Sequence, residues 1–368
     1  MSAWSIILIV CLSVVLLFWL VFGINWRSSR NYKRRHHQLQ SMMQAENTEA
    51  LQSLLFSDEA AMRVEQRFRP LATLLAKNGR PAVSTSGQEI ITSGARKYEL
   101  LMTDLLNARE SIHMEYFHFG IDKSSRRIRR LLMAKAKAGV KVRFINENIA
   151  NFPVPYFYFR LMKRAGVEVV NFSHTPLSPI RFLLTLSYRD HRKIVVIDNH
   201  IGYTGGMNIN EHYFRQWRDT HVRLTGDAVG SLQYAFLDSW LASGGRLQSA
   251  LNTFFHIDKL SDEFHSHTLT QITPDDPTSA KLFLRSGEFM HSKTIVCDDY
   301  LFCVGSTNLD YRSFGIDYEI NTFFYDWDIA LQQKQIFEAD LPICHPLTVS
   351  EAHATRFQRF MHHLAPIV

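Results

Sequence analysis

The feature that most constrains the fold is an internal repeat in which one motif occurs twice along the chain. Residues 191–208 read HRKIVVIDNHIGYTGGMN, and residues 291–308 read HSKTIVCDDYLFCVGSTN. Aligned without gaps, the two segments share His, Lys, Val, Asp, Gly and Asn at six of eighteen positions. An acid follows at the same distance in each copy, because Asp219 and Glu319 both lie 28 residues after the histidine. This repeat predicts two halves related by a pseudo-twofold axis.

The spacing within each copy suits a site that holds phosphate. The β-branched, apolar run Arg192–Ile197 predicts a buried strand. Residues two apart on a strand point to the same face, so His191 and Lys193 project together. Asn208 follows a glycine-containing turn and can return to that face from the neighbouring strand. None of these side chains need carry negative charge, which suits a phosphodiester. The repeat therefore predicts one phosphodiester surrounded by two equivalent sets: His191, Lys193 and Asn208, and His291, Lys293 and Asn308.

A metal centre is the alternative for a cluster of histidines and acids. A lysine beside the ligands would repel a cation, and no set of histidines and acids has helical ligand spacing. The sequence therefore predicts no metal. Asp198 and Asp298 complete the two motifs, and we count them with the catalytic residues. Both fall at strand ends, however, a position that favours a structural salt bridge or a turn contact over direct chemistry.

Alternating helical and strand-like patterns before the first copy predict an α/β sandwich with a parallel or mixed sheet. Gly139 and Gly166 each follow a helical pattern and precede a valine-rich strand, as helix-capping glycines do. After the helical pattern Leu232–Ala242, the segment Arg246–Ser279 is polar and poorly patterned, and strands resume at Lys281. The patterns before the first copy are, in chain order, helix Ala95–Ala108, strand Ser111–Phe119, helix Ser125–Ala138, strand Val140–Ile145, helix Pro155–Ala165 and strand Val167–Phe172.

The N-terminal segment Met1–Trp26 contains no charged side chain. About 20 apolar residues suffice for a helix to cross a bilayer, so we expect one transmembrane helix here. The alternative, a cleaved signal peptide, lacks its basic n-region and its small-x-small cleavage site. Basic residues follow from Arg27, which places the rest of the chain in the cytoplasm. Residues 36–90 have the pattern of a helical stalk that ends in a loop.

The net charge of +6 and the pI of about 9.1 favour anionic partners, and nucleic acid and acidic lipids both qualify. The four cysteines have neither disulfide-scaffold nor zinc spacing, which fits a reducing compartment. The segment Phe357–Leu364 is amphipathic and could lie on a membrane or pack on the protein. One predicted helix is strongly basic, and it forms either a solvated face or a contact with anionic headgroups. Its basic residues are Arg126, Arg127, Arg129, Arg130, Lys135 and Lys137.

The two His-x-Lys-x4-Asp elements resemble the signature of the phospholipase D superfamily, and the chain is more closely similar to bacterial cardiolipin synthases. The resemblance extends over most of the chain. The segments that carry it are YRDHRKIVVID at 188–198, TGGMN at 204–208, WRDTHVRLTG at 217–226, FMHSKTIVCDD at 289–299 and VGSTNLDYRSF at 304–314, with MEYF at 114–117 and FG-x-N at 22–25.

This resemblance implies a phospholipase D-like fold of two pseudo-symmetric α/β/α halves, and phosphatidyl transfer without a cofactor. One histidine attacks phosphorus and forms a phosphohistidine, while the other protonates the leaving alkoxide and then deprotonates the acceptor hydroxyl. By resemblance His191 is the nucleophile and His291 the acid/base, although the symmetry allows the reverse. The lysines and asparagines hold the phosphate oxygens. Asp219 and Glu319 each bind a ring N–H.

The implied donor and acceptor are both phosphatidylglycerol, and glycerol leaves. The partners are then phosphatidylglycerol and anionic membrane lipids rather than nucleic acid. The location is the bacterial inner membrane, with a single span and a cytoplasmic catalytic domain. The alternatives are a phospholipase D or nuclease of the same superfamily, and a membrane protein with a dead site.

The chain departs from the family pattern in two respects. It has one predicted span where relatives usually have two. The second half is also short, because 46 residues separate Gly245 from His291 whereas 80 separate Ser111 from His191. The acceptor pocket is then either open or completed by a second subunit in a homo-oligomer. The expected domains are a membrane anchor at 1–26, a basic juxtamembrane segment and stalk at 27–90, the first half at 91–245, the shortened second half at 246–345 and an amphipathic tail at 346–368.

Overall fold

The structure is a computed structural model of the chain. Among the residues that it describes, no helix is both long enough and apolar enough to cross a bilayer. The predicted transmembrane helix and the predicted C-terminal helix lie outside the described residues. The structure describes residues 39, 41–42, 60–77, 82–172, 189–247, 251–255, 269–273, 283–285, 289–308, 310, 313 and 317–346.

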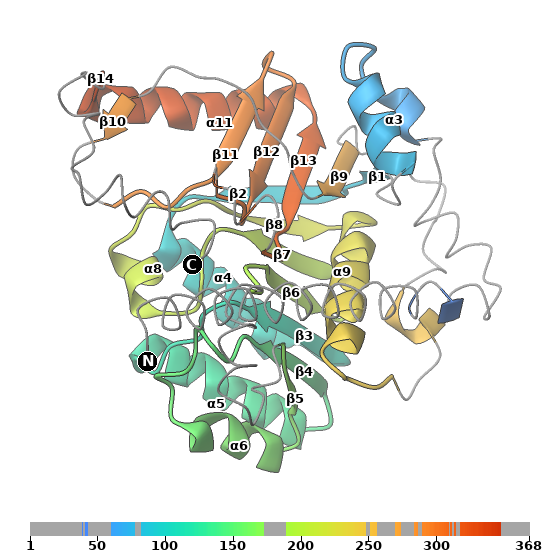
Figure 1. Cartoon of the computed structure of the whole chain (residues 1–368), viewed down its shortest axis with the longest axis vertical. Coiled ribbons are helices and arrows are strands. Elements are labelled where there is room, and N and C mark those ends of the chain that lie inside the picture. Colours follow the sequence, from blue (N-terminus) through green and yellow to red (C-terminus); the bar gives the residue numbers. More distant parts are fainter. Residues whose placement is uncertain are drawn as a thin grey trace, which may run out of the picture.

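A seven-stranded mixed sheet forms the first half, in the order β2-β8-β7-β6-β3-β4-β5 (Figure 1). Strands β3, β4 and β5 are parallel neighbours, and every other pairing in this sheet is antiparallel. The predicted alternation of helices and strands is confirmed to within a few residues. The strands are β2 (Gly87–Ile91), β3 (Ser111–Tyr116), β4 (Lys141–Asn146), β5 (Glu168–Asn171), β6 (Lys193–Ile197), β7 (Ile201–Gly205) and β8 (His221–Thr225).

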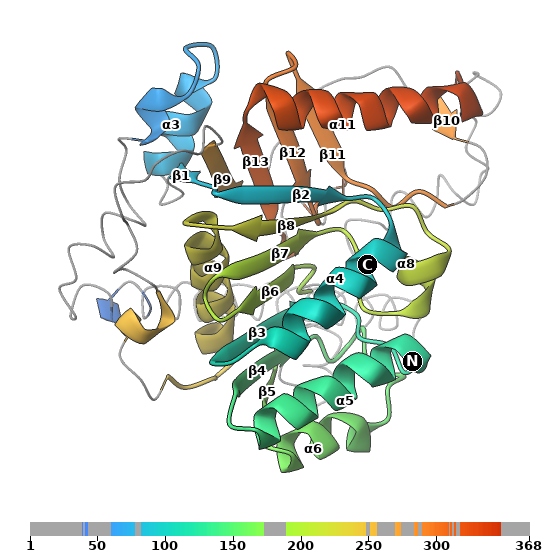
Figure 2. The same cartoon turned by 180° about the vertical axis from the view of Figure 1, so that it is seen from behind.

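Helices cover both faces of this sheet. Three of them lie on the face seen in Figure 2: α4 (Gly94–Asn107), α5 (Lys123–Lys137) and α6 (Tyr156–Arg164). The long helix α9 (Ala228–Ala242) packs on the opposite face, and the short helix α8 (Glu211–Arg215) lies beside α4 and α5. Gly139 and Gly166 follow α5 and α6 with φ of 95°, a conformation that glycine adopts without strain. The capping role predicted for both glycines is confirmed.

The second half is built on a five-stranded sheet in the order β1-β9-β13-β12-β11. Its strands β11, β12 and β13 form an antiparallel meander that repeats β6, β7 and β8, and α11 follows β13 as α9 follows β8 (Figure 1). The bounds are β1 (Val83–Ser84), β9 (Leu269–Thr273), β11 (Thr294–Cys297), β12 (Leu301–Gly305), β13 (Asn321–Tyr325) and α11 (Trp327–Asp340), with a separate pair of strands β10 (Phe283–Arg285) and β14 (Cys344–Pro346).

The two halves share one hydrophobic core. Phe236 and Trp240 of α9 belong to the same buried cluster as Phe302 and Phe324 of the second sheet. Burial of one such aromatic side chain contributes about 2 kcal/mol. The shared core therefore fixes the position of one half against the other, and with it the positions of the two motifs.

The sequence patterns missed several short elements. β1 and β2 lie in the segment predicted as stalk and loop, and β9 lies in the segment Arg246–Ser279 that we interpreted as unpatterned. The predicted stalk helix is interrupted: a 3-10 turn at Ala60–Arg63 precedes α3 (Arg69–Lys77), and both pack on Tyr300 and Leu301 of the second half. Strands of two to five residues carry too few side chains for their alternation to be distinctive.

The two halves differ in the elements described ahead of each histidine motif. In the first half, α4, β3, α5, β4, α6 and β5 lie between β2 and His191. In the second half, the described residues between β9 and His291 hold one strand, β10. Strand β11 is therefore paired on one side within the described part of the sheet, whereas its counterpart β6 is paired on both sides.

Candidate active site

The two histidine motifs meet where the halves join, and the backbone of each pairs with the other half. His191 N donates to Tyr318 O over 2.9 Å, and Tyr318 N donates to Arg189 O over 2.8 Å. The second copy repeats this pattern, because His291 N donates to Arg218 O over 2.7 Å and Arg218 N donates to Phe289 O over 2.9 Å. Each histidine therefore lies beside the residue that precedes the acid of the other half.

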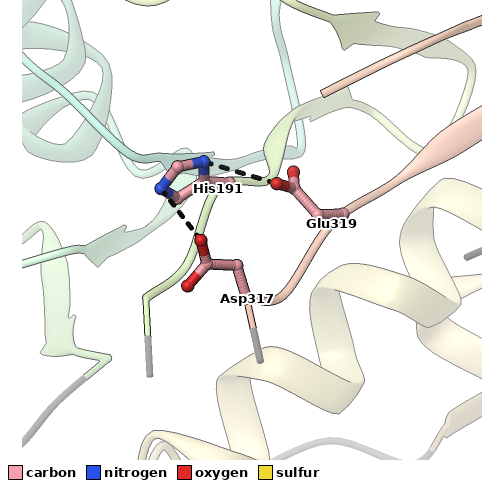
Figure 3. A group of neighbouring side chains, drawn as sticks. All are labelled: His191, Asp317 and Glu319. Atoms are coloured by element: carbon pink, nitrogen blue, oxygen red, sulfur yellow. Dashed lines mark ion pairs between the residues drawn. The ribbon is translucent and has the colours of Figure 1, made fainter. Parts of the chain in front are cut away.

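Each acid consequently contacts the histidine of the other half. Asp219 Oδ2 lies 2.6 Å from His291 Nδ1, and its Oδ1 accepts a 2.6 Å hydrogen bond from Thr220 N. Glu319 Oε1 lies 3.4 Å from His191 Nδ1 (Figure 3), and Ser306 Oγ donates to its Oε2 over 2.5 Å. Both acids are almost fully buried. A carboxylate at Nδ1 fixes the ring and its tautomer, which leaves Nε2 for chemistry.

The two carboxylates are accommodated in different ways. A side chain at Gly206 would place its Cβ 2.2 Å from Asp219 Oδ1, so the glycine leaves the room that the aspartate occupies. The equivalent residue in the second half is Ser306, whose hydroxyl instead binds the longer Glu319. The repeat is therefore symmetric in backbone and asymmetric in side chains.

The two lysines occupy equivalent positions beside the rings. Lys193 Nζ donates to His191 O, and Lys293 Nζ donates to His291 O, each over 2.5 Å. Burial lowers the pKa of both lysines, and that of Lys293 falls to about 8. The charge of Lys193 acts on both His291 and Lys293. Lys193 of the first motif therefore interacts electrostatically with His291 and Lys293 of the second.

His291 lies in an aromatic environment that lowers its basicity. Its ring centroid is 5.4 Å from that of Tyr213 and 5.9 Å from that of Trp217. Burial lowers the pKa of His291, and its hydrogen bond to Asp219 opposes that change. A neutral ring that donates from Nδ1 carries its lone pair on Nε2, as a nucleophile or general base requires.

Asn208 has defined partners, and they are not the histidines. Its Oδ1 accepts from His118 N over 3.1 Å, and its Nδ2 donates to Tyr213 Oη over 3.0 Å. Because Tyr213 packs against His291, Asn208 supports the site through that ring. Asn308, its counterpart in the second half, is half-buried.

The structure places Asp198 and Asp298 away from the histidines, so their predicted catalytic role needs correction. Both aspartates follow the far ends of β6 and β11, roughly 20 Å of extended chain from the histidines. The Asp198 carboxylate accepts 2.8 Å hydrogen bonds from the backbone N–H groups of residues 109, 110 and 111. Asp298 lies 3.5 Å from Arg67 Nη1. Both aspartates adopt positive φ, as turn residues do. The turn and salt-bridge alternative describes their contacts.

Asp317 is a site residue that the sequence analysis missed. Its Oδ2 lies 3.7 Å from His191 Nε2, and the side chain is 2% exposed (Figure 3). Asp317 precedes Glu319 by two residues, so both project from the same face of an extended segment. That spacing could have identified it. The equivalent residue in the first half is Trp217, so a carboxylate faces one histidine and an indole faces the other.

His191, Asp317 and Glu319 bring three ligand-type atoms within 4.8 Å of one another. The two carboxylates, however, approach different nitrogens of the ring (Figure 3). An ion takes a single imidazole nitrogen, so this arrangement suits protons carried on the ring better than an ion shared by all three residues.

A layer of buried polar residues lies next to His191, and the sequence motifs did not indicate it. Arg192 donates from Nε to Glu319 O over 3.2 Å and from Nη1 to Ser239 Oγ of α9 over 2.8 Å. Nearby, burial raises the pKa of Glu115 to about 7, and burial together with Glu115 raises the pKa of Asp190. Because Asp190 adjoins His191, this layer ties the histidine to the core.

With this geometry in place, comparison with known proteins identifies the family. The family model described as "Cardiolipin synthase, PLD-like domain" matches residues 101–240 and 259–341, which is more than half of the chain. The chain belongs to this family. The match includes both histidine motifs and both acids.

Curated relatives and solved structures agree with this membership. The chain is 26% identical to the major cardiolipin synthase ClsA of Bacillus subtilis, over 95% of this chain and 88% of that protein. It is 29% identical to a cardiolipin synthase of Geobacillus kaustophilus, over 85% of this chain and 76% of that protein. Among solved structures, a phosphatidylserine synthase of Haemophilus influenzae shares the fold, with a TM-score of 0.55, 11% identity, and coverage of 83% of this chain and 97% of that one. The predicted phospholipase D-like α/β fold is thereby confirmed.

Proposed function

We propose that this protein transfers a phosphatidyl group from one phosphatidylglycerol to another and releases glycerol, which makes it a cardiolipin synthase. The observation that carries the proposal is the crosswise pairing of His191 with Glu319 and of His291 with Asp219 at one place. Two imidazoles with oriented rings supply the nucleophile and the acid that phosphodiester exchange through an enzyme-bound intermediate requires. Membership of the family supports the choice of phospholipid as substrate.

The proposed reaction has two steps. In the first, Nε2 of one histidine attacks phosphorus, the P–O bond to glycerol breaks, and the other histidine donates its proton to the departing oxygen. In the second, that histidine takes the proton of the acceptor hydroxyl, whose oxygen attacks phosphorus as the P–N bond breaks. Lys193 and Lys293 neutralise the phosphate oxygens in both steps.

The similarity to the family assigns His191 as nucleophile and His291 as acid. One asymmetry supports the reverse. Asp317 Oδ2 lies 3.7 Å from Nε2 of His191, and a nearby carboxylate favours a proton on that nitrogen, as a proton donor requires. Rapid quenching with labelled phosphatidylglycerol, followed by proteolysis, identifies the modified histidine. Label on the peptide that contains His191 supports the first assignment, and label on the peptide that contains His291 supports the second.

We further propose that the apolar segment 1–26 anchors the protein in the bacterial inner membrane with the catalytic domain in the cytoplasm. The uncharged stretch followed by basic residues supports this topology. Both lipid substrates would then reach the site from the bilayer.

The test is incubation of the purified full-length protein in detergent with phosphatidylglycerol as the sole lipid. Cardiolipin and glycerol in equal amounts are the expected products. Phosphatidic acid in place of cardiolipin would make the protein a hydrolase, and cleavage of oligonucleotides alone would make it a nuclease. His191→Ala and His291→Ala should each abolish turnover, because the two groups act as one unit. EDTA should leave the rate unchanged, and inhibition that added zinc reverses would contradict the metal-free mechanism.

A further inference from the structure

A cavity of about 630 Å³ lies next to the aromatic residues that pack on His291, and neither histidine lines it. The beginnings of α4 and α5 and the helix α8 enclose it, and these three helices lie side by side in Figure 2. Tyr213 and Trp217 line the cavity and also pack against the His291 ring. The cavity is therefore one aromatic layer away from the proposed chemistry.

The walls of this cavity are positively charged. Arg127, Arg215 and Arg218 line it, and none of its lining residues in the described part of the chain is acidic. Arg215 Nε lies 3.0 Å from Glu211 Oε1, and Arg218 Nη2 lies 3.2 Å from Asp340 Oδ2, so two of the three guanidinium groups are already oriented by an ion pair. A guanidinium has five N–H donors, so each keeps others for a ligand.

The arginines differ in what they offer a ligand. Arg218 Nη1 has no hydrogen-bond partner among the described residues, but it is buried and so is not presented to the open cavity. Arg127 is exposed at the cavity and forms no ion pair with any described residue. The hydroxyl-bearing residues Ser93 and Ser124 also line the cavity, at the beginnings of α4 and α5. Arginines, hydroxyls and a helix N-terminus together suit a phosphate group.

We propose that this cavity, the Arg127 pocket, binds the phosphodiester of the acceptor phospholipid, which does not react. The inference rests on the proposed function. The acceptor carries its own phosphate on one end of a glycerol, and the hydroxyl on the other end attacks the phosphohistidine. The P–N bond breaks, the new P–O bond forms, and the hydroxyl proton passes to the second histidine. An acceptor therefore needs a second anion site near the reacting phosphorus, and this pocket is next to the site because its wall residues Tyr213 and Trp217 also contact the His291 ring.

The Arg127 pocket also bears on whether the acceptor site is left open by the short second half or is completed by a second subunit. All its lining residues fall between Thr92 and Arg218, within the first half. The residues proposed to hold the acceptor phosphate therefore all belong to the first half.

The experiment compares two reactions of the full-length protein. Cardiolipin formation needs an acceptor phosphate, whereas exchange of labelled free glycerol into phosphatidylglycerol needs only the donor and the histidines. Arg127→Gln should lower the ratio of cardiolipin formation to glycerol exchange by about tenfold and raise the KM for phosphatidylglycerol, because it removes charged hydrogen bonds to the acceptor. The matched control is Arg130→Gln, one turn further along α5 and outside the pocket, which should keep the wild-type ratio.

The outcomes separate the two proposals. An unchanged ratio in Arg127→Gln, or an equal fall in both reactions, would overturn the pocket assignment. Failure of the wild-type protein in glycerol exchange would instead refute the proposed function. A soluble acceptor gives a second measurement: the wild-type protein should use glycerol 3-phosphate in preference to glycerol, and Arg127→Gln should lose that preference. Inorganic phosphate that inhibits both reactions equally would indicate binding at the histidines rather than in the pocket.

Discussion

Asp219 of the first half bonds His291 of the second half, with 2.6 Å between Oδ2 and Nδ1, and Glu319 of the second half in turn lies beside His191 of the first. Each histidine thus depends on the opposite half for its orientation. The single site exists because the shared core brings the halves together, and the crossing explains why each motif is followed by an acid at the same distance.

Replacement of Asp219 by Asn should slow cardiolipin formation by about a hundredfold or more, since an oriented ring and a stabilised imidazolium are lost together. Asp219 also raises the pKa of His291, so its loss lets that pKa fall further. If His291 acts as a neutral ring, the acidic limb of the rate profile should move to lower pH. The measurement is kcat/KM against pH. Glu319→Gln, which alters the partner of His191, is the comparison, and an identical shift in both variants would argue against the crossed pairing.

Asp317 should prove to be a positioning residue for His191. Asp317→Asn keeps the shape of the side chain and removes its charge from Nε2, so we expect kcat to fall by about tenfold with little change in KM. The unfolding midpoint should stay near that of the wild-type protein. A rise in KM with unchanged kcat would assign Asp317 to substrate binding instead.

Lys293 should set the alkaline limit of activity. Burial lowers its pKa to about 8, so the free enzyme loses this positive charge as pH rises through that value. We expect kcat/KM to fall above about pH 8, while kcat falls at higher pH because bound phosphate stabilises the ammonium. Rates measured against pH at low and at saturating phosphatidylglycerol would give the pH dependence of kcat/KM and of kcat separately. Coincident alkaline limbs would contradict the assignment.

Glu115 should make the protein less stable as pH rises. Burial raises its pKa to about 7 in the folded protein from an ordinary value near 4.5, so the folded state binds more protons between these values. Stability from this group is therefore present below about pH 4.5 and lost as pH rises through about 7. Glu115→Gln should reduce this dependence in thermal unfolding followed across that range. The exposed Glu110→Gln is the control, and equal slopes in wild type and Glu115→Gln would refute the prediction.

The repeat predicted the essential parts of the site because strand geometry is local. His191 and Lys193 lie two residues apart at the beginning of a buried strand, and period-two alternation fixes their common direction. The partner of each ring could not be predicted in the same way. The spacing from His191 to Asp219 equals that from His291 to Glu319, so the sequence does not distinguish pairing within a half from pairing across halves. The shared core and the backbone hydrogen bonds between the halves decide it.

The Arg127 pocket and the buried polar layer could not be predicted from the sequence, for a different reason. Arg127 appeared as one of several basic residues on a helix, and its neighbours Arg215 and Arg218 lie more than eighty positions away. Glu115 lies in a segment that carries the family resemblance, but nothing in the sequence placed it near Asp190. Proximity between residues on separate elements leaves no local pattern, whereas the turn positions of Asp198 and Asp298 could be suspected from the strand ends alone.

The side chains at positions 206 and 306 limit how the two halves can change. Gly206 accommodates Asp219, whereas Ser306 binds Glu319. A serine introduced at 206 would occupy the space of the aspartate, and a glycine at 306 would leave the glutamate without its hydroxyl donor. Substitutions at 206 and 219, or at 306 and 319, are therefore expected to be tolerated as matched pairs only. An artificial chain built from two copies of one half would need both residues of that half's pair, 206 with 219 or 306 with 319, in each copy.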